Sequence, residues 1–278
     1  MKLVSKDRIS VMNIHYANYS LDYFLDVQAE LGVKNVELLG GHQGMWIDHK
    51  GYADTAPIRR KLEERGLKCP IITPEGIDYQ YQYSGKSKEL FERSYRFFAN
   101  GVRMGAELGA KILMANSGWG YWTEDYEEGM KRTAEMFSRL SELCAEFDME
   151  VAFESLRPQE SHLCCDLKST KDLIDRVNHP RCKAMLDLTA MEVAGETIED
   201  WYAAFGPEKI NHAHFVDGNP YGHLVWGEGH RNLEQCLNLL NSYGYTGYFS
   251  QELTDSSYYA DPKSVDTRNM RMWSLYTE

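Results

Sequence analysis

Residues 111–154 read KILMANSGWGYWTEDYEEGMKRTAEMFSRLSELCAEFDMEVAFE. This stretch begins and ends with short, largely apolar runs, KILMA and EVAFE, which are typical of strands buried on both faces of a parallel sheet. Between them, Met136, Leu140 and Leu143 are spaced i, i+4 and i+7, so they share one face of a predicted helix. The stretch therefore predicts a strand, a helix and a second strand parallel to the first.

The same unit repeats along almost the whole chain. The other predicted strands are Ile9–Asn13, Asn35–Leu39, Lys68–Thr73, Lys183–Asp187, Ile210–Phe215 and Gly247–Glu252. The clearest predicted helices are Ala56–Glu64, Leu90–Leu108, Tyr126–Phe147 and Leu233–Ser242. Eight units in a chain of 278 residues favour a (β/α)₈ (TIM) barrel, which needs roughly 250 residues.

One α/β domain is expected over residues 1–278, with the last helix at about 262–278. The competing architecture is an open, doubly wound sheet. That fold usually carries a Gly-rich phosphate turn after its first strand, and NIHYANYS (residues 13–20) contains none. The sequence shows no linker or change in composition that would divide the chain.

Composition argues against several classes of protein. The formal net charge of −12 disfavours nucleic-acid binding, which depends on Lys and Arg neutralising phosphates. We find no secretory signal and no apolar stretch long enough to span a membrane. The six cysteines are scattered without metal-binding spacing. These features predict a cytoplasmic protein with reduced thiols and no contact with membranes.

Polar residues end four of the predicted strands in the second half of the chain: Glu154, Asp187, His214 and Glu252. Each is about one repeat from the next, so the four side chains should meet at the carboxyl ends of neighbouring strands, where barrel enzymes place their chemistry. One acid at a strand end is more often a salt-bridge partner or a loop cap. Three carboxylates and one imidazole at one height instead predict a cation site, which suits Mn²⁺, Co²⁺ or Mg²⁺ better than structural zinc.

Several segments resemble the ketose 3-epimerases, which belong to the xylose-isomerase-like barrels and include D-tagatose, D-psicose and fructoselysine 3-epimerases. They are ITPEGIDYQY (72–81), ESLRPQES (154–161), MLDL (185–188), HAHFVDGNPYGHLVWGEG (212–229) and QEL (251–253). The resemblance implies that Glu154, Asp187, His214 and Glu252 bind a divalent cation, with Mn²⁺ the first choice. It also implies that Glu154 and Glu252 are the catalytic acid and base on opposite faces of a sugar.

The resemblance extends to substrate-binding residues. It implies that Glu160 contacts the substrate near its carbonyl end, and that His212, the first histidine of the HxH pair, orients substrate or ligand. Glu75 and His223 lie in loops after the third and seventh strands, which places them near the mouth of the barrel, although solvated loop positions are the simpler interpretation. The tryptophans Trp46 and Trp119 lie in glycine-containing loops, where they could stack on a sugar or pack the loops onto the barrel.

The sequence departs from the ketohexose epimerases at two positions. Ala190 stands where they have a histidine, and Pro220 where they have an arginine, which puts a simple ketohexose substrate in doubt. The chain also resembles the larger subunit of C-glycoside deglycosidases, lyases that cleave the C–C bond between a 3-oxo-sugar and an aromatic aglycone. Those enzymes work with a small β-rich subunit, so either that partner or a homo-oligomer is expected.

An epimerase and a C-glycoside deglycosidase would begin with the same chemical step. A divalent cation acidifies the C–H bond next to a sugar carbonyl, a carboxylate removes the proton, and an enediolate forms. The four residues alone do not distinguish epimerisation, isomerisation and elimination. An abasic-site endonuclease of a related barrel type would need a basic groove and more metal ligands, and a non-catalytic sugar-binding protein would lack a ligand residue.

Overall fold

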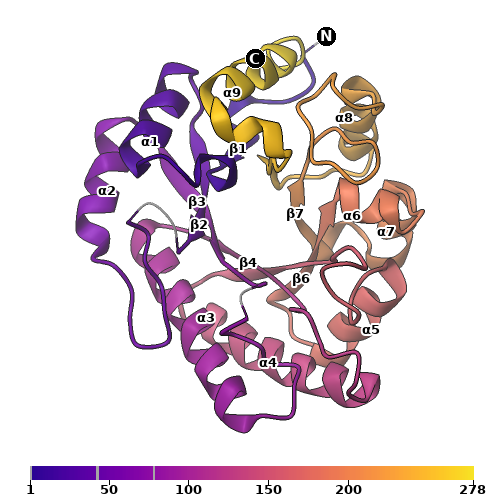
Figure 1. The fold of residues 1–278 in the computed structure, drawn as a ribbon. Helices are drawn as coiled ribbons and strands as arrows, with labels where there is room; N and C mark the ends of the chain where they lie inside the picture. Colours follow the sequence, from indigo (N-terminus) through magenta and orange to yellow (C-terminus); the bar gives the residue numbers. More distant parts are fainter. Residues whose placement is uncertain (1, 42–43, 78) are drawn as a thin grey trace.

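The structure, a computed structural model, describes residues 2–41, 44–77 and 79–278. Eight parallel strands close into a barrel in sequential order, and the helices surround it (Figure 1). The strands are β1 (Ile9–Met12), β2 (Asn35–Gly40), β3 (Lys68–Pro74), β4 (Ile112–Asn116), β5 (Glu150–Glu154), β6 (Cys182–Asp187), β7 (Ile210–His214) and β8 (Tyr248–Gln251). The predicted (β/α)₈ barrel is confirmed. No strand begins or ends more than one residue from its predicted position.

Helices separate the strands. They are α1 (Leu21–Glu30), α2 (Thr55–Glu64), α3 (Lys88–Leu108), α4 (Tyr126–Glu146), α5 (Leu167–Val177), α6 (Leu188–Val193), α7 (Ile198–Phe205), α8 (Leu233–Ser242) and α9 (Pro262–Trp273). Short 3₁₀ turns cover Lys6–Arg8, Ile14–Tyr16, Pro207–Lys209 and Ser256–Ala260. Local sequence explains many of the helix starts. The side chains of Ser87 and Asp125, for example, accept hydrogen bonds from backbone amides in the first turns of α3 and α4.

The C-terminal helix is shorter than the predicted 262–278. Helix α9 ends at Trp273, and the chain then turns back toward the N-terminus, where the amide of Leu3 donates to the carbonyl of Tyr276 at 2.7 Å. Val4 and Thr277 form an isolated parallel bridge. The two ends of the chain therefore lie side by side next to α9 (Figure 1).

Two packing layers hold the barrel. Met136 and Leu140 on α4 are fully buried among the side chains between helices and strands, as the helical spacing predicted. Inside the barrel, a separate apolar cluster contains Ile71, Met114 and Met185. Alternation along each strand assigns residues to the two layers, so the inward-facing positions at the carboxyl ends of the strands are the ones left for chemistry.

No helix in the described part of the chain is long and apolar enough to cross a membrane. All six cysteines are free thiols, and burial raises the pKa of Cys69, Cys144 and Cys182 to about 12. These thiols are therefore protonated and unreactive near neutral pH.

Candidate metal centre

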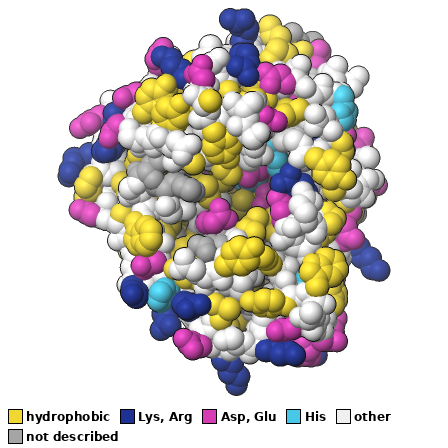
Figure 2. Space-filling view, viewed as in Figure 1, with side chains coloured by type: hydrophobic (Ala, Val, Ile, Leu, Met, Phe, Trp, Pro, Cys, Tyr) yellow, Lys and Arg dark blue, Asp and Glu magenta, His cyan; other side chains and the backbone are white. Residues whose placement is uncertain are grey.

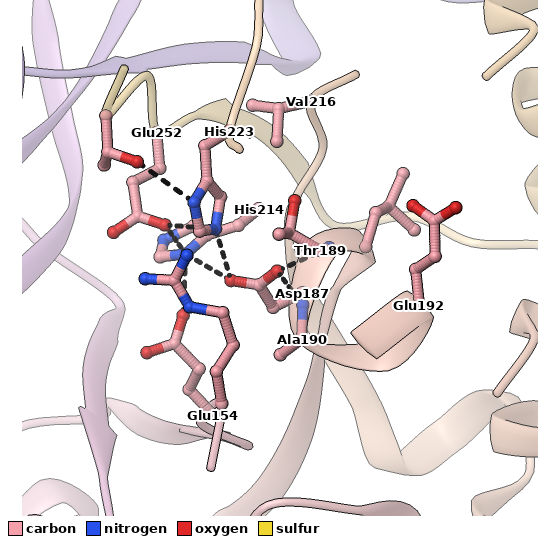
Figure 3. A network of polar contacts seen from close by, with 12 residues as sticks. Glu154, Asp187, Thr189, Ala190, Glu192, His214, Val216, His223 and Glu252 are labelled. Carbon is pink, nitrogen blue, oxygen red and sulfur yellow. Dashed lines mark hydrogen bonds and ion pairs between the residues drawn. The ribbon is translucent and has the colours of Figure 1, made fainter. Parts of the chain in front are cut away.

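Four predicted residues meet at the carboxyl ends of neighbouring strands. Glu154, Asp187 and His214 are the last residues of β5, β6 and β7, and Glu252 directly follows β8. One ligand atom from each lies within 4.8 Å of those of the other three. Figure 3 shows their side chains pointing toward one another from separate strands. Within the residues that the structure describes, this set is one of two groups that could hold a metal ion.

Asp187 both caps helix α6 and faces the cluster. Its Oδ1 accepts hydrogen bonds from the amides of Thr189 at 2.7 Å and Ala190 at 2.9 Å, which caps the start of α6. Its Oδ2 is left to face the cluster, 3.7 Å from Nδ1 of His214. Because the strand passes directly into a helix here, the carboxylate is held in one orientation by the backbone that follows it.

The centre of the cluster has the geometry of a cation site. Nδ1 of His214 lies 2.8 Å from Oε1 of Glu154 and 3.1 Å from Oε2 of Glu252. Neither Nδ1 of His214 nor Oε1 of Glu154 has a hydrogen-bond partner among the described residues, although both atoms are buried. Buried polar atoms normally find a partner. Three carboxylates and one imidazole nitrogen converging on one point are a donor set that fits Mn²⁺, Co²⁺ or Mg²⁺.

Crowding of the acids shifts their pKa values. Burial, with smaller contributions from Glu252 and Asp187, raises the pKa of Glu154 to about 8 despite the attraction of His214. Burial also opposes ionisation of Asp187, but His223 and His214 outweigh it and hold the pKa of Asp187 well below its usual value. Burial would lower the pKa of His214, yet Glu252, Glu37 and Glu154 raise it well above 6.5. The metal-free cluster therefore keeps one proton on Glu154 and a second on the imidazole of His214, and a cation would displace both.

These protons give cation binding a testable pH dependence. Because the folded pKa of Glu154 lies above its ordinary 4.5, the metal-free protein loses stability as the pH rises from about 4.5 through about 8. A cation must displace both protons, so we expect the apparent Mn²⁺ affinity to rise with pH up to about pH 8, by up to about tenfold per pH unit for each proton released. Calorimetric titrations in buffers of different ionisation enthalpy would measure the proton release directly. Equal affinities on both sides of neutrality, without proton release, would contradict the expectation.

A cavity of about 250 Å³ opens above the cluster. Glu154, Asp187 and Glu252 line it, whereas His214 is fully buried and is not among the described lining residues. In Figure 2, acidic and hydrophobic side chains surround a hollow near the middle of this face. Of the predicted substrate-binding residues, three line the cavity: Glu75, Glu160 and His223.

His223 reaches the centre of the site. Its Nε2 lies 3.1 Å from Oδ2 of Asp187 and 3.2 Å from Oε2 of Glu252, and its Nδ1 lies 3.1 Å from Oγ1 of Thr254 (Figure 3). It is 4% exposed, so it is not the solvated loop residue that the simpler interpretation of the sequence offered. His223 comes from the long loop between β7 and α8, and its position depends on how that loop is held.

Asp217 holds the β7–α8 loop. Its carboxylate is fully buried and accepts hydrogen bonds from the amides of Gly218, Gly227, Gly229 and Arg231 at 2.8–2.9 Å. Asp217 also pairs with Leu224, next to His223, in an antiparallel bridge. A Cβ atom at Gly229 would collide with Asp217 Oδ1, which explains the glycine at the end of the GEG motif. The carboxylate of Asp217 thus holds the two ends of this loop together through four backbone amides.

The remaining predicted residues lie away from the cavity. His212 is fully buried below the cluster, where its Nε2 lies 3.0 Å from Oε2 of Glu37. Trp46 is 59% exposed and borders a separate cavity of about 200 Å³. Trp119 is half-buried, and its indole N–H donates to the carbonyl of Ile77 at 2.8 Å. Neither tryptophan is among the described residues that line the central cavity.

Sequence reasoning missed some residues at the site. Arg157 and Tyr259 line the cavity, and Arg157 donates through Nε to Glu160 at 3.0 Å and through a terminal nitrogen to the carbonyl of Tyr221 at 2.7 Å. Arg157 lies within the segment ESLRPQES that carried the resemblance, and its charge beside several acids could have marked it. Glu37, inside the apolar run NVELLG (35–40), offered one signal, a lone acid within a buried strand.

Comparisons with known proteins agree with this architecture. The family model described as the xylose isomerase-like TIM barrel matches residues 25–273. The chain belongs to this family of barrels, as the sequence motifs indicated.

Solved structures of sugar epimerases share the fold over nearly the whole chain. The D-psicose 3-epimerase of Clostridium cellulolyticum H10, solved with D-tagatose, is 15% identical with a TM-score of 0.81, covering 96% of this chain and 97% of that one. The 3-keto-D-glucoside 4-epimerase YcjR from E. coli is 15% identical with a TM-score of 0.79, covering 96% and 98%. An L-ribulose 3-epimerase is 15% identical with a TM-score of 0.78, covering 96% and 93%. At these identities the likeness establishes a common fold.

Proposed function

We propose that the protein is a divalent-metal-dependent epimerase or isomerase of a keto sugar. The observation that carries this proposal is the cluster of Glu154, Asp187, His214 and Glu252 at the bottom of a cavity that opens to solvent. Membership of the xylose isomerase-like family supports it. The epimerases that share the fold act on ketoses and on a 3-keto-glucoside, and both kinds of sugar have a C–H bond next to a carbonyl.

Each residue of the cluster has a proposed task. Asp187 and His214 would hold the cation, with Mn²⁺ the first choice and Co²⁺ or Mg²⁺ the alternatives. Glu154 and Glu252 would hold it too, and they would also move protons, because each lines the cavity where a sugar carbon could lie. When bound, the cation would supply Lewis-acid polarisation of the sugar carbonyl.

The placement of the two glutamates suits proton exchange at one carbon. They approach the cluster from either side of His214 (Figure 3). One carboxylate would remove the proton from the carbon next to the carbonyl, and the other would return a proton to the opposite face, inverting that carbon. Return of the proton to the neighbouring carbon would give isomerisation instead.

The cavity favours a small substrate. Its volume of about 250 Å³ lies below the roughly 300–1,000 Å³ typical of sites for drug-sized ligands, so it suits a single sugar. Glu75, Glu160 and His223 would contact the sugar hydroxyls. Arg157 would hold the carboxylate of Glu160 in place, because two of its nitrogens donate to that group.

Cleavage of a C-glycoside remains the alternative reaction. It would begin with the same proton removal but would need space for an aromatic aglycone. Tyr259 is the one aromatic side chain among the described residues that line the cavity, which favours the epimerase. A homo-oligomer, or a complex with a small β-rich subunit, stays a prediction.

Proton exchange in D₂O would test the proposal. The panel would contain D-psicose, D-tagatose, fructoselysine, a 3-keto-O-glucoside and a 3-keto-C-glucoside, each incubated with Mn²⁺ and again after chelation. We expect deuterium in a recovered epimer, at the carbon next to the carbonyl, and only while Mn²⁺ is present. Release of a free aglycone would instead establish the lyase. Exchange that persists after complete chelation would remove the cation from the proposal.

A further inference from the structure

Glu37 is a fully buried carboxylate on β2, inside the barrel and outside the described lining of the cavity. Its neighbours Val36 and Leu38 belong to the layer between the strands and the helices. Strand alternation therefore directs Glu37 inward, toward β7 on the far side of the closed barrel. An acid in this position needs strong partners, because burial opposes its charge.

Both histidines of β7 supply those partners. Nε2 of His212 lies 3.0 Å from Oε2 of Glu37, and Nε2 of His214 lies 3.2 Å from Oε1. Thr73 of β3 adds a hydroxyl donor to Oε1 at 2.6 Å. Both oxygens of the Glu37 carboxylate therefore face an imidazole nitrogen, and Oε1 also accepts from a hydroxyl.

The hydrogen-bond chemistry fixes the form of His214. The two oxygens of Glu37 are acceptors for Thr73 and the two imidazoles, so the nitrogen of His214 that faces Glu37 is expected to carry a proton. Cation binding requires the neutral imidazole, in which the other nitrogen, Nδ1, carries the lone pair. Nδ1 is the atom that points at Glu154, Asp187 and Glu252. Glu37 thus selects the tautomer that can coordinate a cation.

We propose that Glu37 is a positioning residue for the cation site, which fixes the tautomer and ring orientation of His214 from the far side of the barrel. This inference rests on the proposed function, since it takes His214 as a cation ligand. His212 helps to hold the Glu37 carboxylate, because its Nε2 contacts the second carboxylate oxygen. Its Nδ1 has no hydrogen bond within the described chain, so Glu37 is the hydrogen-bond partner of this imidazole. Thr73 fixes the carboxylate in turn.

The variant Glu37→Gln tests the proposal. Glutamine has the same shape, but its amide offers one oxygen and one NH₂ group to two imidazoles. One histidine must therefore meet a donor and either lose its hydrogen bond or change tautomer. Removing an outer partner of this kind typically costs about 10–100-fold in metal affinity, and we expect a loss of that size for Mn²⁺. The absorption spectrum of the Co²⁺-loaded variant should also shift, because the ligand geometry changes.

Asp266→Asn is the matched control. Asp266 is also a buried carboxylate that pairs with a histidine, accepting contacts from His15 at 2.9 Å, Tyr16 at 2.7 Å and Gln28 at 2.6 Å. His15 belongs to neither cluster that could hold a metal in the described chain. The control should lose thermal stability yet keep the Mn²⁺ affinity and the Co²⁺ spectrum of the unmodified protein.

The outcomes separate the inference from the function on which it rests. If the unmodified protein binds no divalent cation, the proposed function fails. If it binds Mn²⁺ and Glu37→Gln binds equally well with an unchanged Co²⁺ spectrum, the inference alone is overturned. Should the variant not fold, ¹⁵N–¹H correlation spectra of the unmodified metal-free protein, taken at a pH where the imidazole of His214 is neutral, decide the matter, because no cation then dictates the tautomer. A proton on Nε2 of His214 supports the role of Glu37, and a proton on Nδ1 overturns it.

Discussion

Replacing Glu154 by Gln should lower the turnover number by about 10²–10⁴-fold, and Glu252→Gln should have an effect of similar size. Glutamine cannot accept or return a proton, and its neutral oxygen is a weaker cation ligand than a carboxylate. The rates should be measured on the substrate that the exchange experiment identifies, at saturating Mn²⁺. Under those conditions a loss of affinity for the cation alone would not lower the rate.

Glu150→Gln supplies the control for this prediction. Glu150 lies on the same strand as Glu154 but at the other end of β5, where it contacts Lys183 at 2.9 Å and Asn211 at 3.1 Å. The control should keep its turnover within about twofold, because this partly buried ion pair lies at the opposite end of β5 from the cavity. Near-normal rates in Glu154→Gln or Glu252→Gln would remove that residue from the proposed acid and base pair.

Asp217→Asn should give the largest effect on local stability. Two of the four amide donors to Asp217 would face an NH₂ group in place of an oxygen, and hydrogen bonds to charged groups are worth about 1.5–3 kcal/mol each. The β7–α8 loop should therefore lose about 3–6 kcal/mol of stability. Exchange of the amides of Gly227, Gly229 and Arg231 should accelerate by about 10²-fold or more.

Because the loop carries His223, the same variant should also raise KM. Asp200→Asn is a suitable comparison, since Asp200 is an exposed capping residue of α7 that accepts from Thr197. It should change stability by about 1 kcal/mol and leave catalysis unchanged. Unaltered amide exchange in Asp217→Asn would show that the loop is held by something other than this carboxylate.

The fold could be predicted because burial of strands and helices produces a regular pattern of apolar residues in the sequence. Buried parallel strands must be apolar, and amphipathic helices must cover them, so the eight repeats could be read directly. The acids at strand ends stood out because they interrupt those apolar runs. For this reason Glu154, Asp187 and His214 could be expected side by side from spacing alone.

Contacts between residues far apart in the chain produce no regular pattern in the sequence, so they could not be predicted. Glu37 and His214 are 177 residues apart, and only closure of the barrel brings them together. The role of Asp217 depends on four backbone amides, which every sequence has, so its residue type alone could not reveal it. For Trp46, its place in a βα loop predicted a position near the mouth of the barrel. The sequence could not show that Trp46 borders a separate cavity rather than the central one.

The distribution of the cluster over β5, β6, β7 and the residue after β8 has a consequence for how such proteins diverge. The first half of the barrel lines the same cavity with residues such as Leu39, Glu75 and Asn116, yet supplies none of the four side chains. Substitutions at these three lining positions would reshape the cavity while all four side chains of the cluster stay in place. If the proposed function holds, substrate range could therefore change through such positions without the loss of any residue that binds the cation.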